Sequence, residues 1–320
     1  MLLARRASLA LAALLVSACS AWEPASNTAR EAELPSAWRA ESLAGSLPAR
    51  RIIALRREAV QGPASFRLIV IPGSGCSGFA PFAARYFNGL TKAQVIVLHK
   101  PYADVFAGPA PARCSPEFVR HDALSSWRDD VLAALRQVNA GDAAPLPTIV
   151  LGISEGAEIV PYLLPAIPDP LGMVLLSSTG LDPAVAGEMQ AERLGQGQAW
   201  KRLKETAASR QVDETIVEGR SLRYWRDLFG WKLTAALAAA KLPVLRVWGS
   251  DDALLPQQAY DRLRALPSAN ALPVCDWRLE GADHGLQGRR GDGVQLVWER
   301  LENWATKGRL DCGGGIGQLR

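Results

Sequence analysis

The first residues that could do chemistry are a serine and the two glycines on either side of it. Gly152, Ser154 and Gly156 occupy the fixed positions of a G-x-S-x-G motif, which follows the apolar run TIVL and precedes the segment EGAEIVPYLL. Where a strand turns sharply into a helix, small glycines let neighbouring backbone pass closely, and the serine hydroxyl stands clear of the strand. Such a hydroxyl becomes a nucleophile when a base takes its proton. The pattern therefore predicts nucleophilic chemistry at Ser154.

The elements that must position this serine alternate between apolar strands and helices. Strands are predicted at residues 51–60, 66–71, 93–99, 147–152, 172–177, 244–249 and 274–279, and helices at residues 82–90, 123–138, 155–166 and 294–304. Short apolar strands separated by helices are typical of a parallel sheet with helices on both faces. The sequence thus predicts an α/β fold with a mostly parallel central sheet.

Residues 179–241 interrupt this alternation. They form a stretch of about sixty residues with mostly helical spacing, too long for an ordinary connection between two strands. The stretch carries five large aromatic side chains, Trp200, Tyr224, Trp225, Phe229 and Trp231. We interpret it as a helical cap insertion over the candidate site, and a structural lobe that never meets substrate is the alternative.

Two later segments carry a resemblance to the α/β-hydrolase family. The GSDD segment after the strand at 244–249, with Pro256 beyond it, is similar to the family's G-x-x-D-x-x-x-P stretch. This similarity selects Asp252 as the catalytic acid, and Asp251 is the alternative. In the family the acid and then the histidine follow the nucleophile, and of the three histidines only His284 fits that order. The resemblance implies that His284 is the general base, although a lone loop histidine is more often merely solvated.

The family also stabilises an oxyanion with two backbone N–H groups. One comes from the residue after the nucleophile, here Glu155, and the other comes from a loop that follows an earlier strand. The matching loop is PGSGCSG at residues 72–78, in which Ser74 is the best match and Gly75 the alternative. The loop is similar to the family's H-G-x-G loop, except that Pro72 replaces the histidine. Because the donor is a backbone N–H group, that change leaves it in place.

The same loop also satisfies the dinucleotide pattern G-x-G-x-x-G through Gly73, Gly75 and Gly78. A dinucleotide site usually has an acidic residue at the end of the next strand, where this chain has His99 and Lys100. We therefore predict no cofactor. Because the sequence has neither an H-E-x-x-H motif nor paired C-x-x-C motifs, we predict no metal site either.

The N-terminus resembles a bacterial lipoprotein signal. Arg5 and Arg6 precede the apolar run SLALAALLV, which is too short to span a bilayer, and the segment VSAC then ends at Cys19. We expect a signal peptide at residues 1–18, lipidation of Cys19, a tether over residues 19–49 and the α/β domain at residues 50–320. The resemblance implies export to the periplasm with a lipid anchor in the membrane, and an ordinary cleaved signal is the alternative.

The cysteine content agrees with an oxidising compartment. Without Cys19, the four remaining cysteines, Cys76, Cys114, Cys275 and Cys312, allow three pairings. In the α/β-hydrolase family, the loops corresponding to those with the first two cysteines follow neighbouring strands. The last helix of the family returns toward the start of the last strand. The resemblance therefore implies the disulfides Cys76–Cys114 and Cys275–Cys312.

Composition and resemblance together restrict the function. The chain has 320 residues, 48% of them hydrophobic, and a formal net charge of +4 with the two signs interleaved, which gives no nucleic-acid footprint. The resemblance implies a serine hydrolase that acts on a small-molecule ester or another acyl substrate. Because the fold hosts many chemistries, a peptidase, a thioesterase or an inactive envelope-binding lipoprotein remain alternatives.

Overall fold

Three strands at the centre of the fold are buried along their whole length. They are β3 (Phe66–Ile71), β4 (Ala93–Leu98) and β9 (Val244–Gly249). The computed structural model describes residues 34–107, 114–141, 144–266, 274–289, 291–312 and 316–318, and these strands lie there in one nine-stranded sheet. Apolar strands of this kind avoid solvent only if both faces of their sheet are covered.

The sheet has the order β1-β2-β4-β3-β5-β6-β9-β10-β13. Its other strands are β1 (Trp38–Ala44), β2 (Arg51–Arg57), β5 (Thr148–Ile153), β6 (Pro170–Leu176), β10 (Val274–Glu280) and β13 (Ile316–Gln318). Every pairing from β4 to β13 is parallel, and only the pairs β1–β2 and β2–β4 are antiparallel. The mostly parallel sheet predicted from the sequence is therefore confirmed.

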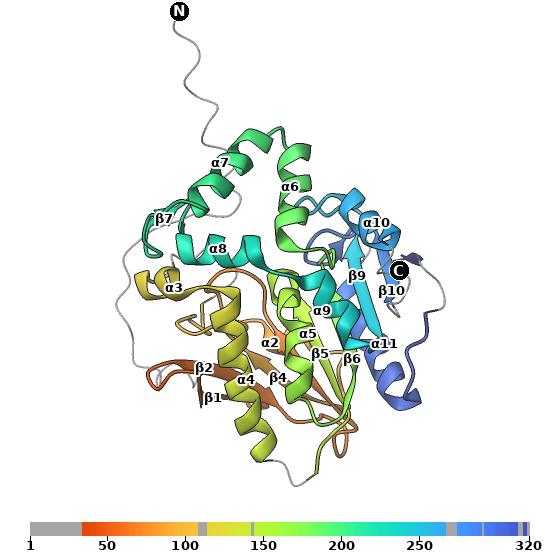
Figure 1. Ribbon diagram of the computed structural model, residues 1–320. Coiled ribbons are helices and arrows are strands. Elements are labelled where there is room, and N and C mark those ends of the chain that lie inside the picture. Colours follow the sequence, from red (N-terminus) through yellow and green to blue (C-terminus); the bar gives the residue numbers. More distant parts are fainter. Residues whose placement is uncertain are drawn as a thin grey trace, which may run out of the picture.

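Helices cover both faces of the sheet (Figure 1). One hydrophobic core lies against α2 (Ala83–Tyr86) and α11 (Gly293–Lys307), and the other lies against α4 (Leu124–Ala140), α5 (Val160–Leu163) and α9 (Leu233–Ala240). Alternate side chains of β3 go to the two cores, so Leu68 packs in the first and Ile69 in the second. The prediction of helices on both faces is also confirmed.

An edge strand lies inside the range that the sequence assigned to the tether. β1 pairs antiparallel with β2 from Trp38 opposite Arg57 to Ala44 opposite Arg51. The indole of Trp38 is 6% exposed and its ring centroid lies 5.5 Å from that of Phe87. An edge strand in a segment rich in Ala, Ser and Glu has little apolar periodicity, and for this reason the sequence did not reveal it. The expected signal peptide and Cys19 lie outside the described residues.

The insertion forms a small layer of its own. It contains α6 (Pro183–Arg193), α7 (Gly197–Ala207), the two-residue strands β7 (Ile216–Val217) and β8 (Arg220–Ser221), and α8 (Leu222–Gly230). Figure 1 shows α6, α7 and α8 together at the top of the molecule, whereas α9 packs on the sheet. Leu203 of α7 and Trp225 of α8 belong to a separate apolar cluster. The cap layer therefore ends with α8, before the predicted limit at residue 241.

The helix predicted at residues 155–166 is broken into three short turns. A 3₁₀ turn, η2 (Ser154–Glu158), is followed by α5 and by a second 3₁₀ turn, η3 (Leu164–Ala166). Pro161 and Pro165 lie in the first turns of α5 and η3, where their missing N–H groups interrupt a continuous helix. The remaining elements are α3 (Pro116–His121), α10 (Gln257–Ala265), β11 (Gln287–Gly288) and β12 (Gly291–Asp292).

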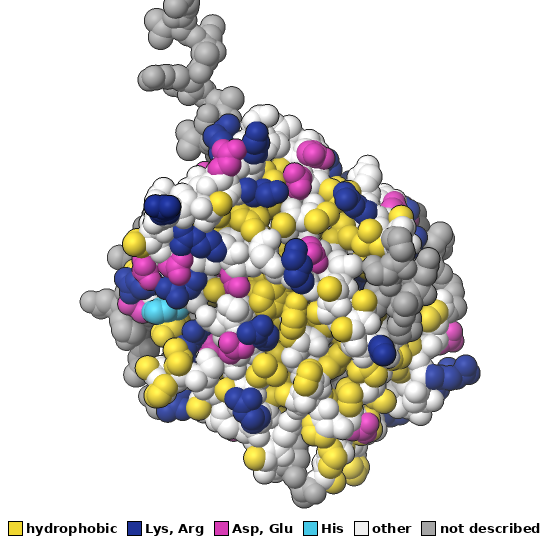
Figure 2. All heavy atoms as spheres, in the orientation of Figure 1, with side chains coloured by type: hydrophobic (Ala, Val, Ile, Leu, Met, Phe, Trp, Pro, Cys, Tyr) yellow, Lys and Arg dark blue, Asp and Glu magenta, His cyan; other side chains and the backbone are white. Residues whose placement is uncertain are grey.

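Two disulfides lie at different parts of the sheet, and Cys275 of one of them is in β10. They join Cys76 to Cys114, with Cα atoms 5.4 Å apart, and Cys275 to Cys312, with Cα atoms 5.2 Å apart. This is the pairing that the family resemblance implies. Basic and acidic side chains are mixed over the face drawn in Figure 2. No helix in the described ranges is long and apolar enough to cross a bilayer.

Candidate active site

The serine of the G-x-S-x-G motif lies at a sharp turn between β5 and η2. Ser154 has a φ of 51°, a left-handed conformation that is strained for a residue with a side chain. A Cβ atom at Gly152 would lie 2.4 Å from Ala157, and one at Gly156 would lie 2.2 Å from the carbonyl oxygen of Pro72. Both glycines are therefore required, because any larger residue would push the turn away from the sheet.

Three residues predicted from separate segments meet at this turn. The Nε2 atom of His284 lies 3.0 Å from Ser154 Oγ, and its Nδ1 atom lies 2.8 Å from Asp252 Oδ2. Because the carboxylate accepts the hydrogen on Nδ1, the lone pair on Nε2 faces the serine hydroxyl. The side chain of Asp252 is 2% exposed and that of His284 is 21% exposed. The chain of hydrogen bonds thus runs from a buried acid to a serine that solvent can reach.

The structure separates the two candidate acids. Besides its contact with His284, Asp252 accepts backbone N–H groups from Leu254 at 2.8 Å and Leu255 at 3.1 Å through Oδ1. Asp251 is exposed and accepts a hydrogen bond from Ser250 Oγ instead. Asp252, and not Asp251, is therefore the carboxylate brought to the imidazole.

Two further residues hold this part of the site, and the sequence analysis missed both. The phenol of Tyr260 in α10 donates to Asp252 Oδ2 at 3.2 Å, and Ser177 Oγ donates to the carbonyl oxygen of His284 at 2.6 Å. Ser177 follows β6 and has a φ of 51°. Neither residue lies in a recognisable motif, although Ser177 does stand at a strand end, where site residues of parallel sheets collect.

The loop at residues 72–78 lies against the serine. A Cβ atom at Gly73 would be 3.5 Å from the Cβ atom of Ser154, and Ser74 beside it is exposed. The end of the loop is fixed by His99, whose Nε2 atom accepts the N–H group of Phe79 at 3.1 Å. Burial lowers the pKa of His99 to about 4, so the ring is neutral and can act as this acceptor.

The side chain of Glu155 enters a buried group of charges. Its Oε1 atom lies 2.8 Å from Nζ of Lys100, which also lies 2.9 Å from Asp122 Oδ1. The other oxygen of Asp122 accepts a hydrogen bond from Arg220 of β8. Four charged side chains thus connect the cap with the residue after the serine. Only Glu155 among them was a predicted site residue.

Two titratable groups border these charges, and the pKa of each is raised. Burial, followed by the charges of Glu155 and Asp182, raises the pKa of Glu158 well above that of a free carboxyl. Burial and the charge of Glu155 likewise raise the pKa of Tyr224. The negative charge of Glu155 therefore disfavours further negative charge on its neighbours.

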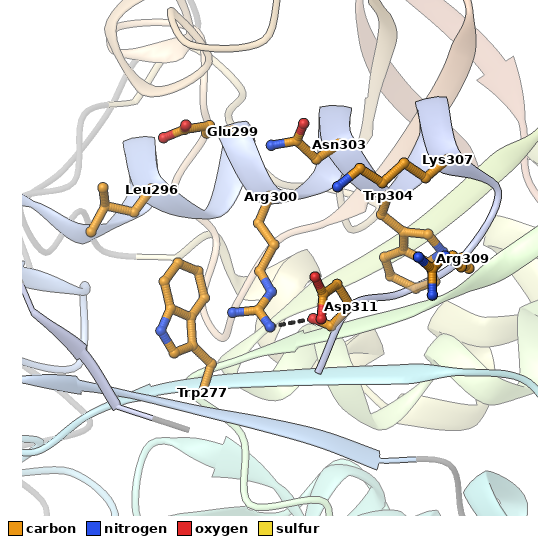
Figure 3. A pocket seen from close by; sticks show the side chains of 9 residues that line it. All are labelled: Trp277, Leu296, Glu299, Arg300, Asn303, Trp304, Lys307, Arg309 and Asp311. Carbon is orange, nitrogen blue, oxygen red and sulfur yellow. Dashed lines mark hydrogen bonds between the residues drawn. The ribbon is translucent and has the colours of Figure 1, made fainter. Parts of the chain in front are cut away.

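A separate cavity of about 280 Å³ lies between α11, β10 and the segment that follows α11 (Figure 3). The guanidinium of Arg300 stands 4.7 Å from the ring centroid of Trp277 and donates to the backbone carbonyl of Asp311. The three residues that meet at the serine turn do not line this cavity. Within the described residues, no group of three His, Cys, Asp or Glu side chains is placed to hold a metal ion.

Comparison with known proteins identifies the fold. No family model and no curated protein match the sequence. The structure is similar to Est1E from Butyrivibrio proteoclasticus, with a TM-score of 0.58 and 15% identity over 84% of this chain and 98% of that chain. It is also similar to a puromycin-hydrolyzing peptidase from Mycobacterium tuberculosis, with a TM-score of 0.55 and 16% identity over 86% of this chain and 41% of that chain.

A third similar structure is the N-acyl homoserine lactonase AidH, with a TM-score of 0.53 and 17% identity over 84% of this chain and 97% of that chain. Together with the strand order and the helices on both faces, these similarities show that the chain has the α/β-hydrolase fold.

Proposed function

We propose that this protein is a serine hydrolase that cleaves carboxylic esters by way of an acyl-enzyme. The observation that carries the proposal is the continuous hydrogen-bond path from Ser154 through His284 to Asp252. A serine, a base and an orienting acid at these distances form the arrangement that activates a hydroxyl for attack on a carbonyl carbon.

In the first half of the reaction, His284 takes the proton of Ser154 as Oγ attacks the carbonyl carbon. Asp252 holds the imidazole in the required tautomer and stabilises its charged form. The negative oxygen of the tetrahedral intermediate is stabilised by the backbone N–H groups of Glu155 and Ser74. The C–O bond of the ester then breaks, and the alcohol leaves with the proton from His284.

In the second half, a water molecule gives its proton to His284 and attacks the acyl carbon. The intermediate collapses, the acid product leaves, and Ser154 regains its proton. The same steps can cleave a thioester or an amide, so the bond type depends on the leaving group that the cap admits. The similar structures include Est1E, a peptidase and a lactonase, and peptidases and lactonases both cleave acyl bonds.

The proposed location of this activity is the periplasmic side of a bacterial membrane, with a lipid anchor at Cys19. The apolar run SLALAALLV and the segment VSAC support this part of the proposal. Detergent-phase partitioning of the processed full chain and of a processed Cys19→Ala variant tests it, because a lipid at Cys19 would carry the processed protein into the detergent phase.

The first test of the catalytic proposal is labelling of the mature protein with a fluorophosphonate probe, beside a folded Ser154→Ala variant. We expect the parent to label and the variant not to. If a folded, disulfide-intact parent fails to label even with small probes, the proposal is wrong. A series of p-nitrophenyl esters, a thioester and an anilide then identifies the bond type.

A further inference from the structure

Buried charges connect the cap with the residue that follows the nucleophile. The side chains of Lys100 and Asp122 are 4% and 1% exposed, and that of Glu155 is 9% exposed. Lys100 touches both carboxylates, at 2.9 Å and 2.8 Å, and Arg220 binds Asp122 from the cap. Lys100 is thus the only described cation in direct contact with the Glu155 carboxylate.

The surroundings of Lys100 are aromatic rather than aqueous. Its Nζ atom lies 4.5 Å from the ring centroid of Trp127 and 5.8 Å from that of Phe118, both of which are buried. Where water is excluded in this way, an ion pair is strong, and removal of one partner leaves the other charge poorly solvated.

The other titratable neighbours of Glu155 do not balance its charge. Glu158 lies three residues further along the 3₁₀ turn, on the same face, and burial and the nearby acids raise its pKa, which disfavours a charge there. Its Oε2 atom is buried and has no hydrogen-bond partner in the described part of the chain. Tyr224 is neutral, since its pKa is raised.

The four charges that pair directly with one another cancel. Lys100 and Arg220 are the cations, and Asp122 and Glu155 are the anions. If Lys100 were neutral, Arg220 would still balance Asp122, but Glu155 would keep an uncompensated charge. That charge would belong to the same residue whose backbone N–H group stabilises the oxyanion in the proposed mechanism.

We propose that Lys100 is a positioning residue, which fixes Glu155 and cancels its charge so that the N–H group of Glu155 can stabilise the oxyanion. This inference rests on the proposed hydrolase function. A carboxylate without a counter-charge would oppose the negative oxygen that forms nearby, and it would also relax away from its present position. The lysine thus makes an acidic residue acceptable directly after the nucleophile.

A role in holding the cap alone makes a different prediction. If Lys100 served only to bind Asp122 and hence Arg220, then the state of Glu155 would not matter. If Lys100 acts on Glu155, removal of the Glu155 charge must restore what is lost when Lys100 is neutralised.

The experiment compares the parent with K100Q, E155Q and the double variant K100Q/E155Q. Glutamine at position 100 keeps an N–H donor but removes the charge. Fluorophosphonate labelling and p-nitrophenyl acetate hydrolysis are measured between about pH 6 and pH 9, and folding is checked by thermal unfolding. We expect K100Q to react about 10- to 100-fold more slowly at the alkaline end, since a single oxyanion donor contributes about 100- to 1,000-fold.

The pH dependence separates a charge effect from a packing effect. In K100Q, Glu155 can take up a proton as the pH falls, so the deficit relative to the parent should shrink toward about pH 6. In the double variant no such proton is needed, so the deficit should be independent of pH. At the alkaline end, we also expect the double variant to react about tenfold faster than K100Q.

A matched control removes another buried cation at the opposite end of the sheet. Arg67 at the start of β3 donates to Gln94 at 2.7 Å, and R67Q should lower the melting temperature without any change in the pH dependence of labelling. If K100Q does not fold, the double variant alone decides, because it contains no uncompensated carboxylate at position 155. A folded double variant that labels no faster than Ser154→Ala would overturn the inference.

The inference also fails if K100Q keeps the parent's rate and pH dependence, or if the double variant is as slow as K100Q throughout. If the parent still reacts with the fluorophosphonate probe, either of these results leaves the hydrolase proposal intact. A folded parent that does not label contradicts the hydrolase proposal itself, so the two failures are distinguishable.

Discussion

The two sides of Ser154 are built in different ways. On one side, here called the acid–base side and made of Asp252, Tyr260 and His284, hydrogen bonds within the α/β body hold the site. On the other, the oxyanion side, the loop at residues 72–78 and Glu155 are held by a disulfide, a neutral histidine and buried ion pairs.

The difference lies in where the supporting residues come from. The acid–base side uses residues that follow the neighbouring parallel strands β9 and β10. The oxyanion side collects Lys100 after β4, Asp122 after α3 and Arg220 from the cap. Displacement of β8 and α8 should therefore disturb the oxyanion side first, whereas the cap meets the acid–base side through α6, where Arg193 donates to the carbonyl oxygen of Ala253 at 2.6 Å. Variants that alter one side at a time distinguish the two.

Replacement of the buried acid should have the largest effect. D252N keeps the shape of the side chain but favours the wrong histidine tautomer, and we expect kcat to fall by about 10⁴-fold. D251N is the matched control, because Asp251 is exposed and its carboxylate accepts a hydrogen bond from Ser250 Oγ and not from His284. It should stay within about threefold of the parent, as is usual for surface substitutions. Steady-state hydrolysis of a p-nitrophenyl ester measures both, and equal losses would contradict the assignment of Asp252.

Removal of Arg220, the cation of the cap that pairs with Asp122, should weaken the oxyanion side. R220M leaves Asp122 buried with Lys100 as its remaining partner, and we expect the free energy of unfolding to fall by about 2–4 kcal/mol. In R223M, the exposed pair between Arg223 and Glu214 is broken, and the loss should be below about 1 kcal/mol. Urea unfolding measures both variants. If R220M is no less stable than R223M, the cap is not held through Asp122.

The contrast also explains which parts of the fold and site could be predicted. Ser154 was predicted from a short motif at a strand end, and Asp252 and His284 were predicted from the family resemblance and the order of residues that it implies. The buried strands were found because their apolar runs are nearly continuous. The serine motif and the apolar strands are local signals in the sequence, whereas the acid and the base needed the family's order of residues.

The ion pairs of the oxyanion side have no such signal. Lys100, Asp122 and Arg220 look like ordinary surface residues in the sequence, because their burial depends on how the cap folds back over the body. β1 was missed because an edge strand needs few apolar residues, and the breaks within residues 155–166 were missed although two prolines marked them. Long-range packing determines the ion pairs and β1, whereas the breaks in the helix follow from the two prolines.

The neutral histidine of the oxyanion side should make stability depend on pH. The pKa of His99 is about 4 in the folded protein, against an ordinary value of 6.5, so protonation favours the unfolded chain as the pH falls between these values. The parent should lose about 2–3 kcal/mol between pH 7.5 and pH 4.5 through this residue, and H99Q should lack that part of the loss. Urea unfolding at the two pH values measures the difference.

His121 provides the control for this measurement. It lies at the end of α3 and its ring stacks on the exposed Tyr102. Burial and nearby arginines lower its pKa, but it is less enclosed than His99, so H121Q should change the pH dependence of stability less than H99Q does. The opposite order would show that the oxyanion loop does not depend on a neutral His99.

The smallest effect should come from the hydrogen bond that Tyr260 donates on the acid–base side. The ring of Tyr260 is buried and stacks on Trp248 with centroids 4.3 Å apart, so Y260F keeps the packing and removes only the hydroxyl. Asp252 then has one donor fewer on Oδ2 and attracts the protonated form of His284 more strongly. We expect the acidic limb of the pH–rate profile to move to higher pH, by up to about one unit, and kcat/KM at the optimum to fall about three- to tenfold.

Y162F is the matched control, because the phenol of Tyr162 donates to the backbone of Lys232 at 2.9 Å and touches no residue of the proposed mechanism. Its acidic limb should coincide with that of the parent. A loss of rate in Y260F without a shift of the limb would mean that the hydroxyl only supports packing around α10. The Asp252 carboxylate would then be held by His284 and by the N–H groups of Leu254 and Leu255. A shift with little loss of stability would show that the acid–base side is adjusted by a single hydrogen bond from an uncharged donor, whereas the oxyanion side depends on balanced buried charges.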